Sequence, residues 1–147
     1  MRRFVLVPII ALSMIALAAA TVPSDKEAFD GAMETASRQL RTMRRTKFDP
    51  KSQLQNLESI QTLEQALLTA KANLGAIDMS PAAKEKFGSD TLAYRSAFRT
   101  ELVKSIQSTL VIELAVLNGD ADAASEAYKQ LGSLRNDAHD LFEPPTE

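Results

Sequence analysis

Helix-start and helix-stop signals divide most of this 147-residue chain into four long stretches, and this division constrains the fold more than any other feature. The chain has no Gly-rich loop and no run of alternating apolar and polar residues that would predict a strand. Within the stretches, apolar residues recur at steps of three and four, the spacing of a helix with one apolar face. We therefore predict an all-α fold.

The first stretch opens with Ser24-Asp25-Lys26-Glu27, which has the form of a capping box, and runs to about Arg45. In a capping box the serine and the glutamate satisfy backbone amides that the first helical turn leaves unpaired. The apolar stripe of this helix is predicted to face the core and consists of Phe29, Met33, Ala36, Leu40 and Met43.

The second stretch begins at Asp49-Pro50, where a proline at the first helical position costs no hydrogen bond, and ends at Gly75. A connection from residue 76 to residue 89 follows. Within it, Ser80-Pro81 and Gly88 are predicted to bound a short turn of helix. The core positions of the second helix are predicted to be Leu54, Leu57, Leu67 and Leu74.

The third helix is predicted from about Asp90 to Leu117 and the fourth from about Asp120 to Phe142. Asn118-Gly119 separates these two helices, and Pro144-Pro145 prevents the fourth from continuing. Short loops force consecutive helices to pack antiparallel. Four amphipathic helices with mostly short links therefore favour an antiparallel up-down-up-down four-helix bundle.

The first twenty residues have the pattern of a secretory signal peptide: two arginines, an apolar run and three alanines at a cleavage site. An uncleaved membrane anchor is the alternative, but the apolar run is shorter than the roughly 20 residues that a spanning helix needs. We expect cleavage, a periplasmic location, a single domain over residues 21–147 and no stable membrane anchor after cleavage.

Charge and cysteine content exclude several classes of function. Removing Arg2 and Arg3 with the signal leaves 15 of the 17 basic residues against 19 acidic ones, a net charge of −4. Nucleic acid is therefore not an expected partner. The chain has no cysteine, which excludes disulfides, iron-sulfur ligation and the covalent attachment of c-type haem. Any haem must be held without covalent bonds.

Four side chains that suit haem are predicted to gather at one end of the bundle. In an up-down-up-down bundle, the start of the first helix and the end of the fourth lie at the same end, and Met33 and the single histidine, His139, differ in height by about 6 Å. Tyr94 and Phe98 lie at that end too. Each residue also has a plain structural interpretation: Met33 and the two aromatic residues as core packing, and His139 as a surface residue.

Two short segments strengthen the haem interpretation. They read GAMET at residues 31–35, near the start of the first helix, and RNDAH at residues 135–139, near the end of the fourth. With Tyr94, Phe98 and the secretion signal, they resemble the soluble periplasmic cytochrome b562 family. The resemblance implies one non-covalent haem b per chain, with Met33 and His139 as axial ligands of its iron.

In such a protein the haem iron is six-coordinate and carries single electrons, so the resemblance implies a carrier and not an enzyme. Arg135, one turn before His139, is either a partner for a haem propionate or a solvated surface residue. The electron-transfer partners are expected to be periplasmic proteins, which the sequence does not identify. Basic residues near the end of the first helix either complement the helix dipole or form a docking patch for an acidic partner: Arg38, Arg41, Arg44, Arg45 and Lys47.

Two other classes of function compete with an electron carrier. A haem-free periplasmic chaperone or stress-binding protein built on the same helices is the main alternative. A carboxylate-bridged metal enzyme is disfavoured because its bundle motif uses Glu-x-x-His pairs. The chain has one histidine, and the residue three positions before it is Asn136.

Overall fold

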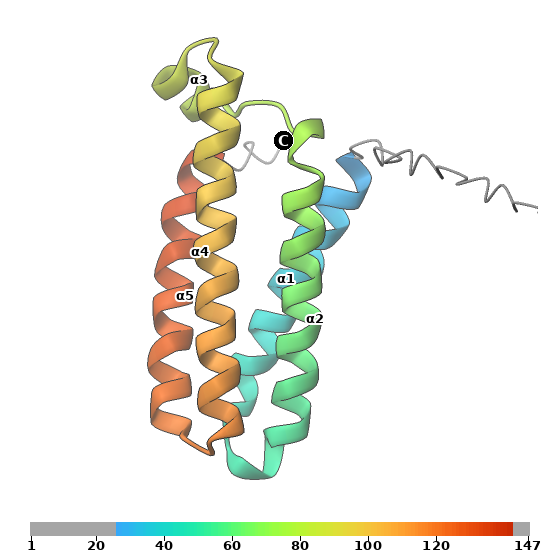
Figure 1. The fold of residues 1–147 in the computed structure, drawn as a ribbon, viewed down its shortest axis with the longest axis vertical. Coiled ribbons are helices and arrows are strands. Elements are labelled where there is room, and N and C mark those ends of the chain that lie inside the picture. Colours follow the sequence, from blue (N-terminus) through green and yellow to red (C-terminus); the bar gives the residue numbers. More distant parts are fainter. Residues whose placement is uncertain (1–25, 143–147) are drawn as a thin grey trace, which may run out of the picture.

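The computed structural model describes residues 26–142 and is all-α over that range, with no strand among them (Figure 1). This confirms the predicted fold class. The predicted signal peptide, the Ser24 cap and Pro144-Pro145 lie outside the described residues. The long helices are α1 (Lys26–Thr46), α2 (Gln53–Ala72), α4 (Thr91–Leu117) and α5 (Ala121–Phe142), and the short elements are η1 (Pro50–Ser52), η2 (Leu74–Ala76) and α3 (Pro81–Phe87).

The side chains predicted to start helices do so, with one shift in position. The Ser80 hydroxyl accepts a hydrogen bond from the Ala83 amide, and the Asp90 carboxylate accepts one from the Ala93 amide. Asp49 caps the short 3-10 turn η1 and not α2 itself, accepting from the Lys51 amide at 2.8 Å. The second long helix therefore begins three residues later than the Asp49-Pro50 signal predicts.

The turn between α1 and α2 has an unusual backbone. Lys47 and Phe48 both have a positive φ, of 52° and 56°. Residues other than glycine adopt this left-handed conformation at a cost. Here the conformation directs the Phe48 side chain into the core, where it is 6% exposed and its ring meets the Tyr128 ring edge-on at a centroid distance of 5.8 Å. This ring contact packs the α1–α2 turn against α5.

The long helices lie along the long axis of the molecule and pack in chain order (Figure 1). Within residues 26–142, α1 packs on α2, α2 on α4 and α4 on α5, whereas the backbones of α1 and α5 barely approach each other. In Figure 1, α1 starts beside the upper part of α2, passes behind it and ends near the foot of α4. Its upper part is therefore well separated from α5, the helix on the far left.

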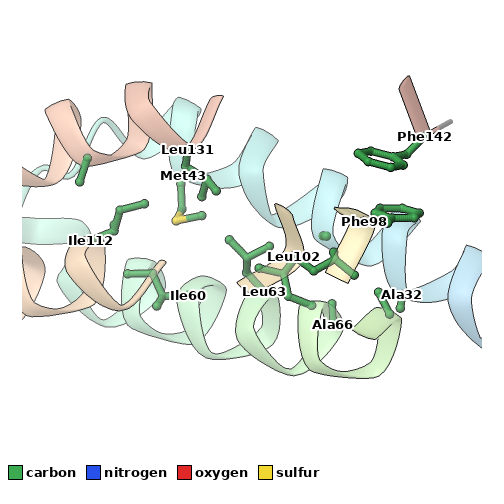
Figure 2. Packing of buried hydrophobic residues seen from close by; sticks show 14 of the residues in the cluster. Ala32, Met43, Ile60, Leu63, Ala66, Phe98, Leu102, Ile112, Leu131 and Phe142 are labelled. Carbon is green, nitrogen blue, oxygen red and sulfur yellow. The ribbon is translucent and has the colours of Figure 1, made fainter. Parts of the chain in front are cut away.

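The core runs along the interior between the four long helices (Figure 2). One predicted core position lies outside the core. Leu54, expected to mark the buried face of α2, is 77% exposed. On α1 the buried line passes through Ala32, and Met33 is half-buried at the edge of the core. The most deeply buried apolar side chains include Met43, Ile60, Leu63, Leu102, Ile112 and Leu131.

No helix within residues 26–142 combines the length and the apolar character that crossing a membrane requires.

Candidate functional site

One hydrogen bond fixes the relative height of α1 and α5. The Tyr128 hydroxyl of α5 donates to the Leu40 carbonyl oxygen of α1 at 2.8 Å. Met33 precedes Leu40 by two helical turns, so these two residues lie on the same side of α1. Arg135 follows Tyr128 by two turns, so these two lie on the same side of α5. The N-terminus of α1 and the C-terminus of α5 both lie at the upper end in Figure 1. We call the line formed by Leu40, Met33, Tyr128, Arg135 and His139 the α1–α5 seam.

Met33 and His139 both lie on the seam, at similar heights. Met33 is about 10 Å above the Leu40–Tyr128 hydrogen bond and His139 about 16 Å above it, at about 1.5 Å per residue. The difference of about 6 Å is the one expected from the sequence. Met33 is half-buried against the core, whereas the His139 side chain is exposed. The two side chains thus come from helices that the Tyr128–Leu40 hydrogen bond joins lower down and that are separated at this end (Figure 1).

Arg135 lies on α5 one turn below His139, level with Met33 on α1, and is exposed. Its positive charge also reaches Tyr128. Burial raises the pKa of the Tyr128 hydroxyl, while the charges of Arg44 and Arg135 act in the opposite direction. The hydroxyl therefore stays protonated at neutral pH and can keep donating to Leu40. An exposed guanidinium one turn from His139 is available to an anionic group at the seam.

Tyr94 and Phe98 of α4 stand behind the seam in an aromatic cluster with Phe29 of α1 and Phe142 of α5. The Phe98 and Phe142 rings stack at a centroid distance of 4.5 Å with an interplanar angle of 11° (Figure 2). The Phe29 ring meets Phe98 edge-on at 5.7 Å. Tyr94 is 1% exposed and Phe98 is 5% exposed. Phe98 therefore contacts both of the helices that border the seam.

Two side-chain hydrogen bonds involving the segment between α2 and α4, residues 73–90, stabilise this end of the molecule. The Ser80 hydroxyl, besides capping α3, donates to the Leu141 carbonyl oxygen in the last turn of α5 at 2.7 Å. The Tyr94 hydroxyl donates to the Asp78 carbonyl oxygen at 3.3 Å. Burial raises the pKa of Tyr94, and the nearby Asp78 carboxylate raises it further, although Arg95 opposes both. The connection thereby holds the turn of α5 that carries His139.

The five residues singled out in the sequence lie at the same end of the molecule, although the upper part of α1, which carries Met33, is well separated from α5 (Figure 1). Met33, Arg135 and His139 lie on the seam, and Tyr94 and Phe98 lie behind it. Sequence reasoning placed Phe29 in the core but did not assign it or Phe142 to this site, where both cover Phe98. A signal for them exists: Phe29 is one turn before Met33 on the predicted apolar stripe, and Phe142 is one turn after Ala138, which packs against the core.

The donor chemistry of the seam fits haem iron. A thioether and an imidazole are an established pair of axial ligands, and neither needs to lose a charge in order to bind. Within residues 26–142, no three His, Cys, Asp or Glu side chains are grouped as metal ligands. Tyr94 and Phe98 fit less directly, since their rings are already packed against Phe142.

A small open hollow lies at the opposite end of the molecule, between the α1–α2 and α4–α5 turns. Its volume is about 90 Å³. Sites for drug-sized ligands occupy roughly 300–1,000 Å³, so this hollow is too small for a haem. It is lined by Phe48, Asp49, Pro50, Gln53, Val116, Gly119 and Ala121.

Comparisons with known proteins found no matching family model, no similar curated protein and no similar solved structure.

Proposed function

We propose that this protein is an antiparallel up-down-up-down four-helix bundle that binds one haem b without covalent bonds and carries single electrons in the periplasm. Met33 and His139 are the proposed axial ligands. The observation that carries the proposal is the register of the α1–α5 seam. The hydrogen bond from Tyr128 to Leu40 brings a thioether and an imidazole to similar heights on two helices that separate at that end.

Haem held in this way supplies a one-electron couple between Fe(III) and Fe(II). The chain supplies the two ligands and holds them on helices that are fixed elsewhere. Tyr128 ties α5 to α1 below the ligands, and Ser80 ties the last turn of α5 above them. Ligands held in this way stay in place when the charge of the iron changes, so electron transfer needs little rearrangement.

Arg135 is proposed to pair with a haem propionate. It is exposed on the seam, level with Met33, and a guanidinium recognises a carboxylate through two parallel hydrogen bonds. Tyr94 and Phe98 would reach the haem only by giving up part of their contact with Phe142. We therefore assign them a supporting role behind the ligands, as the wall against which the α1 and α5 ends pack.

A docking patch for an acidic redox partner is proposed on the lower half of α1. Arg38, Arg41, Arg44, Arg45 and Lys47 are all exposed. Two of the guanidiniums are already engaged locally: Arg38 donates to Thr35 and Arg45 to Thr42. The last basic residues also meet the negative end of the α1 dipole, so a structural role coexists with docking.

The proposal is tested by titrating haem into the mature chain and recording the visible spectrum. We expect one haem per chain, a sharp Soret band and the split bands of low-spin iron after reduction. A featureless visible spectrum would contradict the proposal and favour the haem-free chaperone. The Met33→Ala variant should bind carbon monoxide in the ferrous state, because it opens a coordination position, whereas the wild type should not. Met79→Ala, which removes another half-buried methionine, is the matched control.

A further inference from the structure

Exposed large apolar side chains are confined to two adjacent helices of the described chain. Two of them lie on α2 and six on α4, and neither α1 nor α5 carries one. Monomeric soluble proteins rarely expose contiguous apolar patches of more than a few hundred Å². The eight residues are Leu54, Leu68, Leu92, Val103, Leu110, Val111, Leu114 and Leu117.

The outer face of α4 carries apolar residues at the spacing found where one helix packs on another. Val103, Leu110, Leu114 and Leu117 are separated by steps of seven, four and three, so they form one stripe. The buried residues of α4 form a second stripe on the opposite side, which includes Phe98, Leu102, Ile112 and Val116. A helix that is apolar on both sides is normally covered on both sides.

A side-chain contact sets the register between α2 and α4. The Gln53 side-chain amide of α2 donates to the Val116 carbonyl oxygen of α4 at 2.9 Å. Leu54 therefore lies within one turn of Leu117 in height, and Leu68, four turns or about 21 Å further along α2, lies within one turn of Val103. The two helices lie side by side (Figure 1). We call the surface formed by Leu54, Leu68, Val103, Leu110, Leu114 and Leu117 the α2–α4 face.

Polar residues within the two apolar rows of the α2–α4 face carry no charge, whereas Glu64 and Glu113 lie between the rows, where α2 and α4 meet. Gln61 lies between Leu54 and Leu68, and Gln107 lies between Val103 and Leu110, both exposed. Interfaces between proteins are depleted of charged residues at their centre, as these apolar rows are, and the two half-buried carboxylates between the rows are the exception. Charges lie beyond the two ends of the apolar stripe on α4: Arg99 above it, and Asp120 and Asp122 below it, all exposed.

We propose that the α2–α4 face binds a second copy of this chain in an antiparallel, two-fold symmetric dimer. The symmetry places the Leu54–Leu117 end of one copy against the Leu68–Val103 end of the other, so that apolar residues cover apolar residues. It also brings Arg99 to the level of the other copy's acidic α4–α5 turn. The exposed surface of the six side chains of the face is on the order of 500 Å², a large part of the roughly 800 Å² per partner of a standard interface.

A lipid surface fits this face less well than a second copy does. The exposed side chain of Glu58 on α2 and the half-buried Glu64 and Glu113 border the apolar rows. These carboxylates disfavour approach to an anionic bilayer, which attracts basic segments. The face is built from the two helices that do not form the α1–α5 seam, so the dimer leaves the proposed haem ligands accessible and does not depend on haem.

The test is sedimentation velocity of the mature chain without haem. We expect a mass twice that of one chain. The Leu110→Glu/Leu114→Glu variant places two charges at the centre of the face and should weaken association at least tenfold, giving the mass of one chain. Gln130→Glu/Ser133→Glu adds the same charges to an exposed part of α5 and should leave the dimer intact. Far-UV circular dichroism of both variants checks that the helices persist.

Cross-linking gives a second readout, because the chain has no cysteine of its own. Leu110→Cys should form a disulfide between two copies under mild oxidation, since Leu110 lies near the proposed two-fold axis, and Gln130→Cys should not. The proposal is overturned if the wild type has the mass of one chain at about 100 µM. It is also overturned if the Leu110→Glu/Leu114→Glu variant has the same mass as the wild type. A wild type that is monomeric and moves with lipid vesicles in a flotation gradient would overturn it as well. None of these results bears on haem binding.

Discussion

Glu64 of α2 and Glu113 of α4 place two carboxylates at the contact between these helices. One oxygen of Glu64, Oε1, is buried and has no hydrogen-bond partner among the described residues. Burial raises the pKa of Glu64, and the negative charge of Glu113 raises it further. A carboxyl whose pKa is raised by folding favours the folded state when it is protonated and opposes it when it is ionised.

Replacing Glu64 by glutamine should therefore stabilise the protein at neutral pH. The contribution of the wild-type carboxyl is fully present below its unfolded pKa and is lost as the pH rises through the higher folded value. Urea unfolding at several pH values should show the gain of Glu64→Gln at pH 7 and its disappearance below about pH 4. Glu58→Gln, at an exposed position of the same helix, is the control. A gain independent of pH would refute the electrostatic explanation.

The elements around the seam depend on one another through a few polar contacts. The short helix α3 and its connection are joined to the end of α5 by Ser80, whose hydroxyl both caps α3 and donates to Leu141. The same side chain is 2% exposed, so water cannot readily replace either hydrogen bond. The turn of α5 that carries His139 is consequently held by an element more than fifty residues away in the sequence.

Replacing Ser80 by alanine should loosen the end of α5 as well as the start of α3. Loss of an N-cap costs about 1 kcal/mol, and the second hydrogen bond adds to this. Hydrogen exchange should become faster for the backbone amides of the last turn of α5 and remain unchanged in its first turns. Ser133→Ala removes an exposed hydroxyl of α5 and is the control. Equal exchange in Ser80→Ala and the wild type would show that Leu141 is held by other contacts.

Caps and periodicity predicted the helices well because both are local. Ser80, Asp90, Gly88 and Gly119 bound elements where the sequence indicated. The sequence did not predict Lys47 and Phe48 at positive φ, since only the packing of Phe48 on Tyr128 compensates for that conformation.

Leucine patterns on α2 and α4 were harder to interpret. Leu54 is three residues before Leu57 but lies about 140° around α2 from the buried Leu67, so it is exposed. On α4, which carries apolar residues on two faces, periodicity cannot tell which face points inward. The candidate site residues were found by their chemistry and height along the helices. Their division into a seam and an aromatic layer depends on Phe29 and Phe142, whose contacts are tertiary.

At the scale of the whole molecule, the four long helices present two different sides. Along the seam, α1 and α5 are bridged by Tyr128 low down and diverge above it, where Met33, Arg135 and His139 lie. On the side of α2 and α4 the helices pack closely and carry the exposed leucines. This separation allows the proposed haem site and the proposed dimer interface to function independently.

The most direct test of the haem proposal is the spectrum of the ferrous haem complex of His139→Ala beside that of the wild type. His139 is the chain's single histidine, so no other imidazole can replace it as a ligand. The proposal predicts that the split low-spin bands of the wild type are lost in the variant and that haem is bound much more weakly. An unchanged low-spin spectrum in His139→Ala would show that His139 does not bind the iron.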